Sequence, residues 1–123
     1  MFWEGNLSSP DPDFSAYVFK AGKQANGLVV SAEAFKDADG ITVPVAWLGE
    51  YCADYTLGHA VLHHQLDGIT GEIFFNDTER GQKAKNFVIQ DGGKNLSIYA
   101  TQIEQNCDEI VNGVIRVLTI SRF

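Results

Sequence analysis

A helix, a glycine pair and a strand follow one another in residues 77–101, and this stretch limits the possible folds more than any other. Asp77 or Thr78 is placed to accept hydrogen bonds from the free amides of a first helical turn. Gly92 and Gly93 supply the left-handed backbone that ends a helix. The helical stripe predicted to face the core comprises Ala84, Phe87, Val88 and Asp91.

The strand that follows is predicted at residues 95–101. Side chains alternate along a strand, so Leu96, Ile98 and Ala100 share one face and Ser97 lies on the other. Ser97 is therefore a hydroxyl fixed on a rigid element, directly after a helix and a tight turn. This position makes Ser97 the first candidate for a catalytic nucleophile.

The rest of the chain reads mainly as short strands separated by turns. Asp67-Gly68 is a tight-turn signal, so the strands on either side of it are predicted to form a β-hairpin. Pro44 cannot donate to a strand ladder and indicates an edge or a bulge. Residues 31–36 are predicted to form one short capped helical turn. The remaining predicted strands are residues 14–20, 27–30, 41–48, 57–64, 69–75 and 114–121.

These elements predict a mainly β fold with one long and one short helix. Chains rich in short strands usually protect their sheet edges by closing the sheet, so we expect a small antiparallel β-barrel, closed or partly closed. Residues 14–123 form the expected single domain. Residues 1–13 are a turn-rich, loosely ordered leader, in which Phe2 and Trp3 are candidates for a contact surface.

Composition excludes several classes of function. A net charge of −7 argues against nucleic acid as a partner, because phosphate binding needs clustered basic residues. No apolar run approaches the roughly 20 residues that span a bilayer, and no signal peptide is visible, so we expect an intracellular protein without a membrane partner. Cys52 and Cys107 lack metal-site spacing, so no metal and no cofactor are expected. Two buried or half-buried thiols are predicted, and their pairing is left open.

Several segments, taken in order, resemble the phage prohead proteases of the HK97 type, whose barrel is related to that of the herpesvirus assemblins. The likeness extends over residues 27–121 and depends on the order and spacing of the segments. Leu96-Ser97-Ile98 resembles the family strand that presents the nucleophile. The other segments that carry the resemblance are residues 27–35, 43–47 with 57–60, 75–81 and 115–121.

The resemblance implies a serine nucleophile, a histidine base and an acidic third residue. Matched position by position, the nucleophile is Ser97, the base falls on Gly49 and the acid falls on Thr119. Glycine cannot accept a proton and threonine carries no charge, so two of the three roles are lost. Glu50, beside the base position, is too acidic at its ordinary pKa to deprotonate serine efficiently.

The expectation that follows is a catalytically degenerate, prohead-protease-like barrel. It would act by protein–protein binding as a phage or prophage structural or assembly protein, with capsid, scaffold or connector proteins as partners. We also expect a homo-oligomer, located in the bacterial host cytoplasm during assembly or in the virion.

Two alternatives stay open. An active serine endopeptidase that processes capsid or scaffold protein would use Ser97 with a displaced base, His59 or His63, which share one face of their predicted strand. His64 lies on the other face. A small-ligand-binding barrel would instead need a deep apolar pocket with a few polar groups.

Overall fold

The computed structural model describes residues 11–122, and within them the chain forms eight strands, one α-helix and two 3-10 helices. The 3-10 helices span Lys36–Ala38 and Ala53–Tyr55. The regular elements are β1 (Phe14–Lys20), β2 (Gly22–Lys23), β3 (Val29–Val30), β4 (Thr42–Trp47), β5 (Gly58–Gln65), β6 (Gly68–Phe75), α1 (Glu79–Asp91), β7 (Leu96–Asn106) and β8 (Glu109–Ile120).

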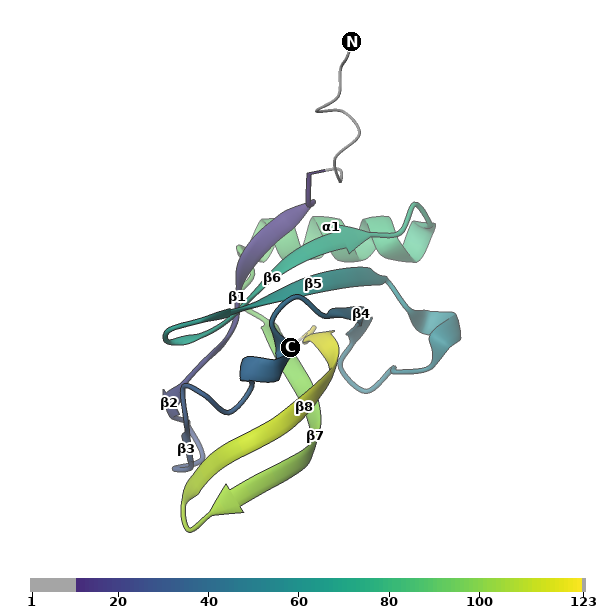
Figure 1. Ribbon diagram of the computed structural model, residues 1–123. Coiled ribbons are helices and arrows are strands. Elements are labelled where there is room, and N and C mark those ends of the chain that lie inside the picture. Colours follow the sequence, from purple (N-terminus) through teal and green to yellow (C-terminus); the bar gives the residue numbers. More distant parts are fainter. Residues whose placement is uncertain (1–10, 123) are drawn as a thin grey trace.

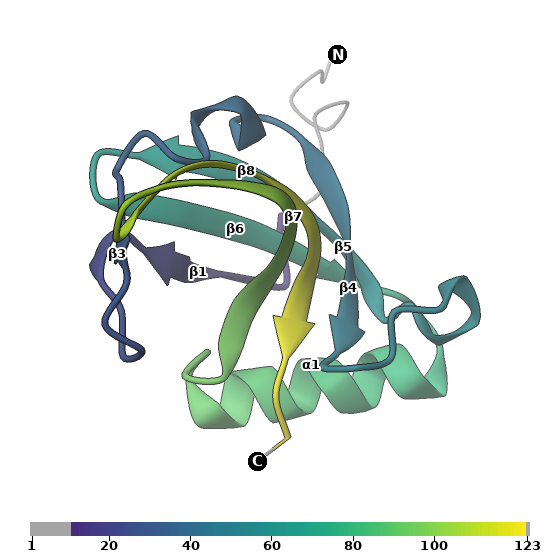
Figure 2. The same ribbon diagram turned by 90° about the horizontal axis from the view of Figure 1, so that it is seen from below.

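The strands form one sheet that curls into a nearly closed barrel (Figures 1 and 2). The order β1-β6-β5-β4-β8 runs around it, β7 adds to the outer edge of β8, and β7 comes close to β1. The predicted mainly β class and its barrel are confirmed at this level. The prediction of an antiparallel barrel was wrong in part, because β8 pairs in parallel with both β4 and β3. Those pairings join distant segments, and turn signals reveal only pairing between strands that are neighbours in the sequence.

The barrel interior holds the hydrophobic core. Its fully buried side chains alternate with exposed ones along the strands, as expected for a sheet with one covered face. The largest are Leu57, Leu62, Ile69, Ile73, Leu118, Ile120, Val45 and Val88.

Helix α1 lies across the ends of β4, β7 and β8 (Figure 2). Thr78 is its N-cap, with the side-chain oxygen accepting a hydrogen bond from the Gly81 amide at 3.0 Å. Gly92 ends it in the left-handed conformation, with φ 70°. Ala84 and Val88 are buried in the core, as the predicted stripe required.

The last two strands are longer than predicted. We expected the final strand at residues 114–121, but β8 begins at Glu109 and forms a long hairpin with β7. Part of this hairpin extends beyond the barrel, away from α1 (Figure 1). A positive φ at Gln102 and three register shifts interrupt the regular alternation, and the positive φ at Cys107 lies in the turn between the two strands. Because of this irregularity, the alternation of side chains in the sequence did not predict the full length of the two strands.

Pro44 lies in β4 where that strand has a partner on only one side. β4 pairs with β5 over residues 42–45 and with β8 only from Val45 onward. The strand is therefore an edge at Pro44, as predicted. The short helix was expected at residues 31–36. The structure instead has a turn there, with the Ser31 hydroxyl accepting from the Glu33 amide at 3.2 Å, and then the 3-10 helix.

Asp13 ties the start of β1 to the barrel. Its amide donates to the Ile73 carbonyl at 2.8 Å, its carboxylate accepts from the Phe75 amide at 2.8 Å, and it lies 3.3 Å from the Lys85 ammonium. The barrel contacts therefore begin one residue before the predicted domain boundary. Phe2 and Trp3, the predicted contact pair of the leader, lie outside the described residues.

Cys52 and Cys107 are free and exposed, so the prediction of buried or half-buried thiols was wrong. Cys52 precedes a 3-10 helix in a surface loop, and Cys107 lies in the β7–β8 turn. Turn positions project into solvent whatever the polarity of the side chain they carry. Within residues 11–122, no helix has the length and apolar character to cross a bilayer.

Candidate functional site

Ser97 lies at the start of β7, with its side chain exposed on the outer face of the barrel. The junction before it is held by Asp91, whose carboxylate accepts from the Gly93 amide at 2.8 Å and from the Asn95 side chain at 2.9 Å. Gly93 has φ 79°, and a Cβ there would meet the ring of Phe14 at 2.7 Å. The glycine thus allows β1 to approach this junction closely.

The structure brings the three positions of the expected triad into one neighbourhood. Ser97 is the direct cross-strand partner of Thr119, which in turn pairs with Ala46 on β4. Gly49 follows β4 in a turn that begins where the Leu48 amide donates to the Ile120 carbonyl at 2.9 Å. The three positions therefore converge, but a glycine, a threonine and a serine together hold no group that can accept a proton from the hydroxyl.

The outer face beside Ser97 is covered by a loop. Directly opposite residues share a face, so Thr119 and Val117 lie on the same outer side as Ser97 and Tyr99. Yet Thr119 is only 2% exposed and Val117 only 6%. The loop of residues 48–56 reaches this face, and its Tyr51 stacks on Tyr99 with ring centroids 5.0 Å apart.

The three histidines of the chain lie on β5, and each contacts a group other than Ser97. His63 Nε2 is 2.8 Å from the Glu72 carboxylate, and the His59 ring stacks on Phe74 at 4.9 Å. β4 and β8 separate β5 from β7. Three strand spacings put β5 about 14 Å from β7 along the sheet. The structure therefore does not bring His59 or His63 to Ser97.

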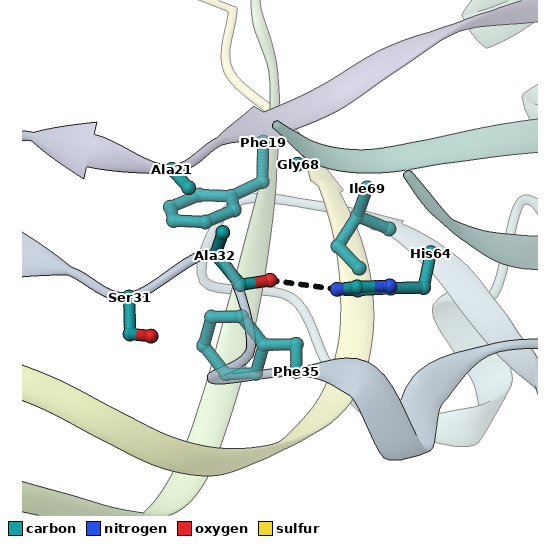
Figure 3. Close-up of a pocket in the computed structure, with 8 residues that line it drawn as sticks. All are labelled: Phe19, Ala21, Ser31, Ala32, Phe35, His64, Gly68 and Ile69. Carbon is teal, nitrogen blue, oxygen red and sulfur yellow. Dashed lines mark hydrogen bonds between the residues drawn. The ribbon is translucent and has the colours of Figure 1, made fainter. Parts of the chain in front are cut away.

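His64 points to the other side of β5 and holds the segment after β3. Its Nε2 lies 2.7 Å from the Ala32 carbonyl oxygen, as Figure 3 shows, and its amide donates to Asp39 at 2.9 Å. The space between these side chains and the neighbouring rings of Phe19 and Phe35 is too small for a water molecule. His64 therefore has a structural partner.

Glu50 has a structural partner as well. Its carboxylate accepts from the Arg122 guanidinium at 3.0 Å, and the same guanidinium lies 4.3 Å from the Trp47 ring centroid. Trp47 in turn meets Phe87 of α1 edge-on at 5.5 Å. This carboxylate is therefore engaged by Arg122.

Four exposed apolar and aromatic side chains lie on the loop of residues 48–56 and on β7, and we call them the tyrosine ledge. Leu48 is 58% exposed, and Tyr51, Tyr55 and Tyr99 are all exposed as well. Arg80 of α1 lies over Tyr55 at 4.4 Å. Sequence reasoning missed the ledge, although Tyr99 shares the strand face of Ser97, and Tyr51 and Tyr55 lie four residues apart in one loop.

The cavities near these elements are small. One of about 150 Å³ is lined by Leu48, Glu50, Ile120 and Arg122, and another of about 110 Å³ lies between the 3-10 helix at Lys36–Ala38 and β8. Ligand pockets usually hold roughly 300 Å³ or more. Among residues 11–122, no group of three or more histidine, cysteine or acidic side chains is placed to hold a metal ion.

Comparisons with protein-family models, with curated proteins and with solved structures found no match for this chain. The likeness to prohead proteases therefore depends on the sequence segments alone.

Proposed function

We propose that this protein is a non-catalytic phage or prophage assembly protein that works by binding other proteins. The proposal depends on one observation, which is that the positions around Ser97 hold no base. Its cross-strand neighbour is Thr119, and the position expected to supply a base is Gly49. A serine without a base is a very weak nucleophile, and loss of the base in a triad enzyme reduces turnover by on the order of a million-fold.

The tyrosine ledge supports a binding role, and its Tyr51–Tyr99 stack lies on the strand face of Ser97. Protein interfaces are enriched in tyrosine, tryptophan and arginine, and their strongest contacts centre on such residues. Here Tyr51 and Tyr99 stack on each other and Arg80 covers Tyr55, so the rings are held in place before a partner arrives. Aromatic side chains that are already ordered lose little conformational entropy on binding.

Two measurements test the proposal. First, a fluorophosphonate probe should label the protein no more than it labels the Ser97→Ala variant, because no group activates the hydroxyl. Labelling that depends on Ser97, or self-cleavage abolished by that substitution, would support the endopeptidase alternative with His59 or His63 as base.

Second, an epitope-labelled chain should co-sediment with heads or head precursors from phage-producing cells. The matched control is a variant with Tyr51 and Tyr99 changed to serine, which should fold and lose this association. A wild-type chain found only in the free protein fraction would contradict the assembly role.

A further inference from the structure

The chain contains two Asn-Gly pairs, Asn26-Gly27 and Asn112-Gly113. Asparagine is among the chemically labile residues of proteins. The backbone nitrogen of the next residue can attack the side-chain carbonyl carbon Cγ, and a glycine there leaves that nitrogen unobstructed because it has no Cβ. A five-membered succinimide forms as ammonia leaves, and water then opens it to isoaspartate or aspartate. The structure places the two pairs in opposite surroundings.

Asn26 lies in the turn between β2 and β3, where β3 joins the edge of the sheet (Figure 1). Asn26 and Gly27 are both exposed. The Gly27 amide donates to the Gln24 carbonyl of the same turn at 2.9 Å. β2 and β3 pair over only two residues, and such a short exposed element opens locally at little cost. Opening of the turn therefore frees the attacking nitrogen without unfolding the barrel.

The side-chain oxygen of Asn26 is held by a backbone donor. Its Oδ1 accepts a hydrogen bond from the Leu28 amide at 3.0 Å. Attack on Cγ moves negative charge onto this oxygen, and a backbone N–H aimed at such an oxygen stabilises the transition state. The Leu28 amide therefore favours the reaction at Asn26.

Asn112 has the opposite arrangement, because it lies within β8, opposite Glu104 of β7. Its Oδ1 accepts from the Gly113 amide itself at 2.9 Å, so that N–H points at the oxygen. Loss of the proton would leave the electron pair of the nitrogen facing the oxygen and not Cγ. Gly113 is buried, and a Cβ there would meet the side chains of Phe35 and Ile103 within 2.8 Å. The backbone has little room to turn into an attacking position.

Glu104 restrains Asn112 further. Its carboxylate accepts from Asn112 Nδ2 at 2.9 Å, so both ends of the side-chain amide are bound. A carboxylate at this distance also opposes the negative charge that develops in the transition state. The β7–β8 hairpin therefore protects the asparagine that it carries.

We propose that Asn26 is a site of spontaneous deamidation and that Asn112, which has the same motif, is not. The reaction forms a bond between Asn26 Cγ and the Gly27 nitrogen and breaks the bond between Cγ and Nδ2. The Gly27 proton goes to solvent, and Nδ2 takes up a proton and leaves as ammonia. Hydrolysis by water then adds one negative charge to a chain of net charge −7.

The isoaspartate product should loosen the β2–β3 hairpin. It routes the backbone through the former side chain and adds a methylene group to the turn. β3 is joined to β8 over only two residues, and the Val29 amide donates to the Asp108 carbonyl at 3.0 Å. Hydrogen exchange at Val29 should therefore become faster in the modified chain, while amides of β5 and β6 keep their protection.

Peptide mapping by mass spectrometry tests the proposal on the full chain, incubated at mildly alkaline pH in the folded state and in guanidinium chloride. Denatured, the two pairs should react at similar rates because they share the same local chemistry. Folded, Asn26 should react at least about 10-fold faster than Asn112, a ratio that corresponds to about 1.4 kcal/mol between the two barriers. The change of mass from amide to acid distinguishes deamidation from isomerisation at the three Asp-Gly pairs, which leaves the mass unchanged.

Variants test the cause at each site. Asn26→Gln should abolish modification of the β2–β3 turn, because glutamine would have to form a larger ring. Glu104→Ala frees the Asn112 amide and should raise the rate at Asn112 while leaving that at Asn26 unchanged. Its matched control is Glu109→Ala in the same hairpin, which should change neither rate. Circular dichroism checks the fold of each variant.

Similar rates at the two pairs in the folded chain, or a faster reaction at Asn112, would overturn the inference. A folded chain whose Asn26 stays intact while the denatured chain is modified would overturn it as well. An unchanged rate at Asn112 in a folded Glu104→Ala variant would refute the protective role assigned to Glu104. The comparison of folded and denatured wild type needs no variant, so it decides the proposal if a variant does not fold.

Discussion

Ser97 and Thr119 lie directly opposite each other on β7 and β8, yet Ser97 is exposed and Thr119 is 2% exposed. The two positions share the outer face of the barrel, and the loop of residues 48–56 reaches that face through the Tyr51–Tyr99 stack. The position that the sequence resemblance matches to an acid is thus a buried neutral residue. This relationship makes the proposed loss of catalysis testable by substitution.

Placing a carboxylate at Thr119 should destabilise the protein. Thr119→Glu would bury a charge without a partner, and we expect a loss of about 3 kcal/mol in the free energy of unfolding. Urea unfolding measures it. The control is Ser97→Glu on the opposite strand, which leaves the charge in water and should cost less than about 1 kcal/mol. Equal losses for the two variants would contradict the burial of Thr119.

Replacing Gly49 with histidine should strain the backbone. Gly49 has φ 90°, and no other atom lies within 4 Å of where its Cβ would stand. Gly49→His should therefore lose about 1–2 kcal/mol through backbone strain alone. Gly49→Asn should lose less, because asparagine tolerates positive φ better. Thermal unfolding distinguishes the two, and a histidine variant as stable as the wild type would show that the turn is freely adaptable.

Gly58 and Gly71 offer a matched pair on β5 and β6. A Cβ at Gly58 would overlap the Phe74 carbonyl oxygen and lie 2.9 Å from the Phe75 Cα, so backbone must move. At Gly71 the nearest atoms are side-chain carbons of Leu118 and Val18 at 3.2 Å. We expect Gly58→Ala to cost about 3 kcal/mol and Gly71→Ala about 1 kcal/mol. Reversed magnitudes in urea unfolding would contradict the close approach at Gly58.

The N-cap of α1 gives a local prediction. Thr78→Ala removes the acceptor for the Gly81 amide and should cost about 1 kcal/mol. Thr78→Ser keeps that acceptor and should stay within a few tenths of the wild type. Helicity and the unfolding midpoint report both changes. An alanine variant without loss would mean that water replaces the cap fully.

Tyr17 should lose its proton at a higher pH than an ordinary tyrosine. Its hydroxyl donates to the Asp67 carboxylate at 2.8 Å, and this hydrogen bond raises the pKa of Tyr17, with smaller contributions from burial and from the charge of Asp67. A raised folded-state pKa contributes stability below the unfolded value near 10, and that stability is lost as pH rises through the folded value. Phenolate absorbance should show one tyrosine that ionises at a higher pH than the others, and Asp67→Asn should lower its pKa.

Local patterns predicted much of the fold. The helix and its two caps, the hairpin around residues 67–68 and the alternation at Ser97 all depend on residues close together in sequence, and all appear where expected. The extended β7–β8 hairpin was missed because Gln102 and three register shifts break its alternation. The parallel pairing of β4 with β8 was missed because no local signal specifies which distant strands meet.

The sequence by itself determined that Ser97 sits on a strand after a helix and that no base stands at Gly49, since both follow from residue identity and spacing. Tertiary structure alone decided that Thr119 is its buried neighbour, that β4 and β8 separate the histidines on β5 from Ser97 on β7, and that the Tyr51 ring stacks on Tyr99 of the same strand. Such neighbours come from segments far apart in the chain. Their meeting depends on how the sheet closes, which is a property of the whole fold.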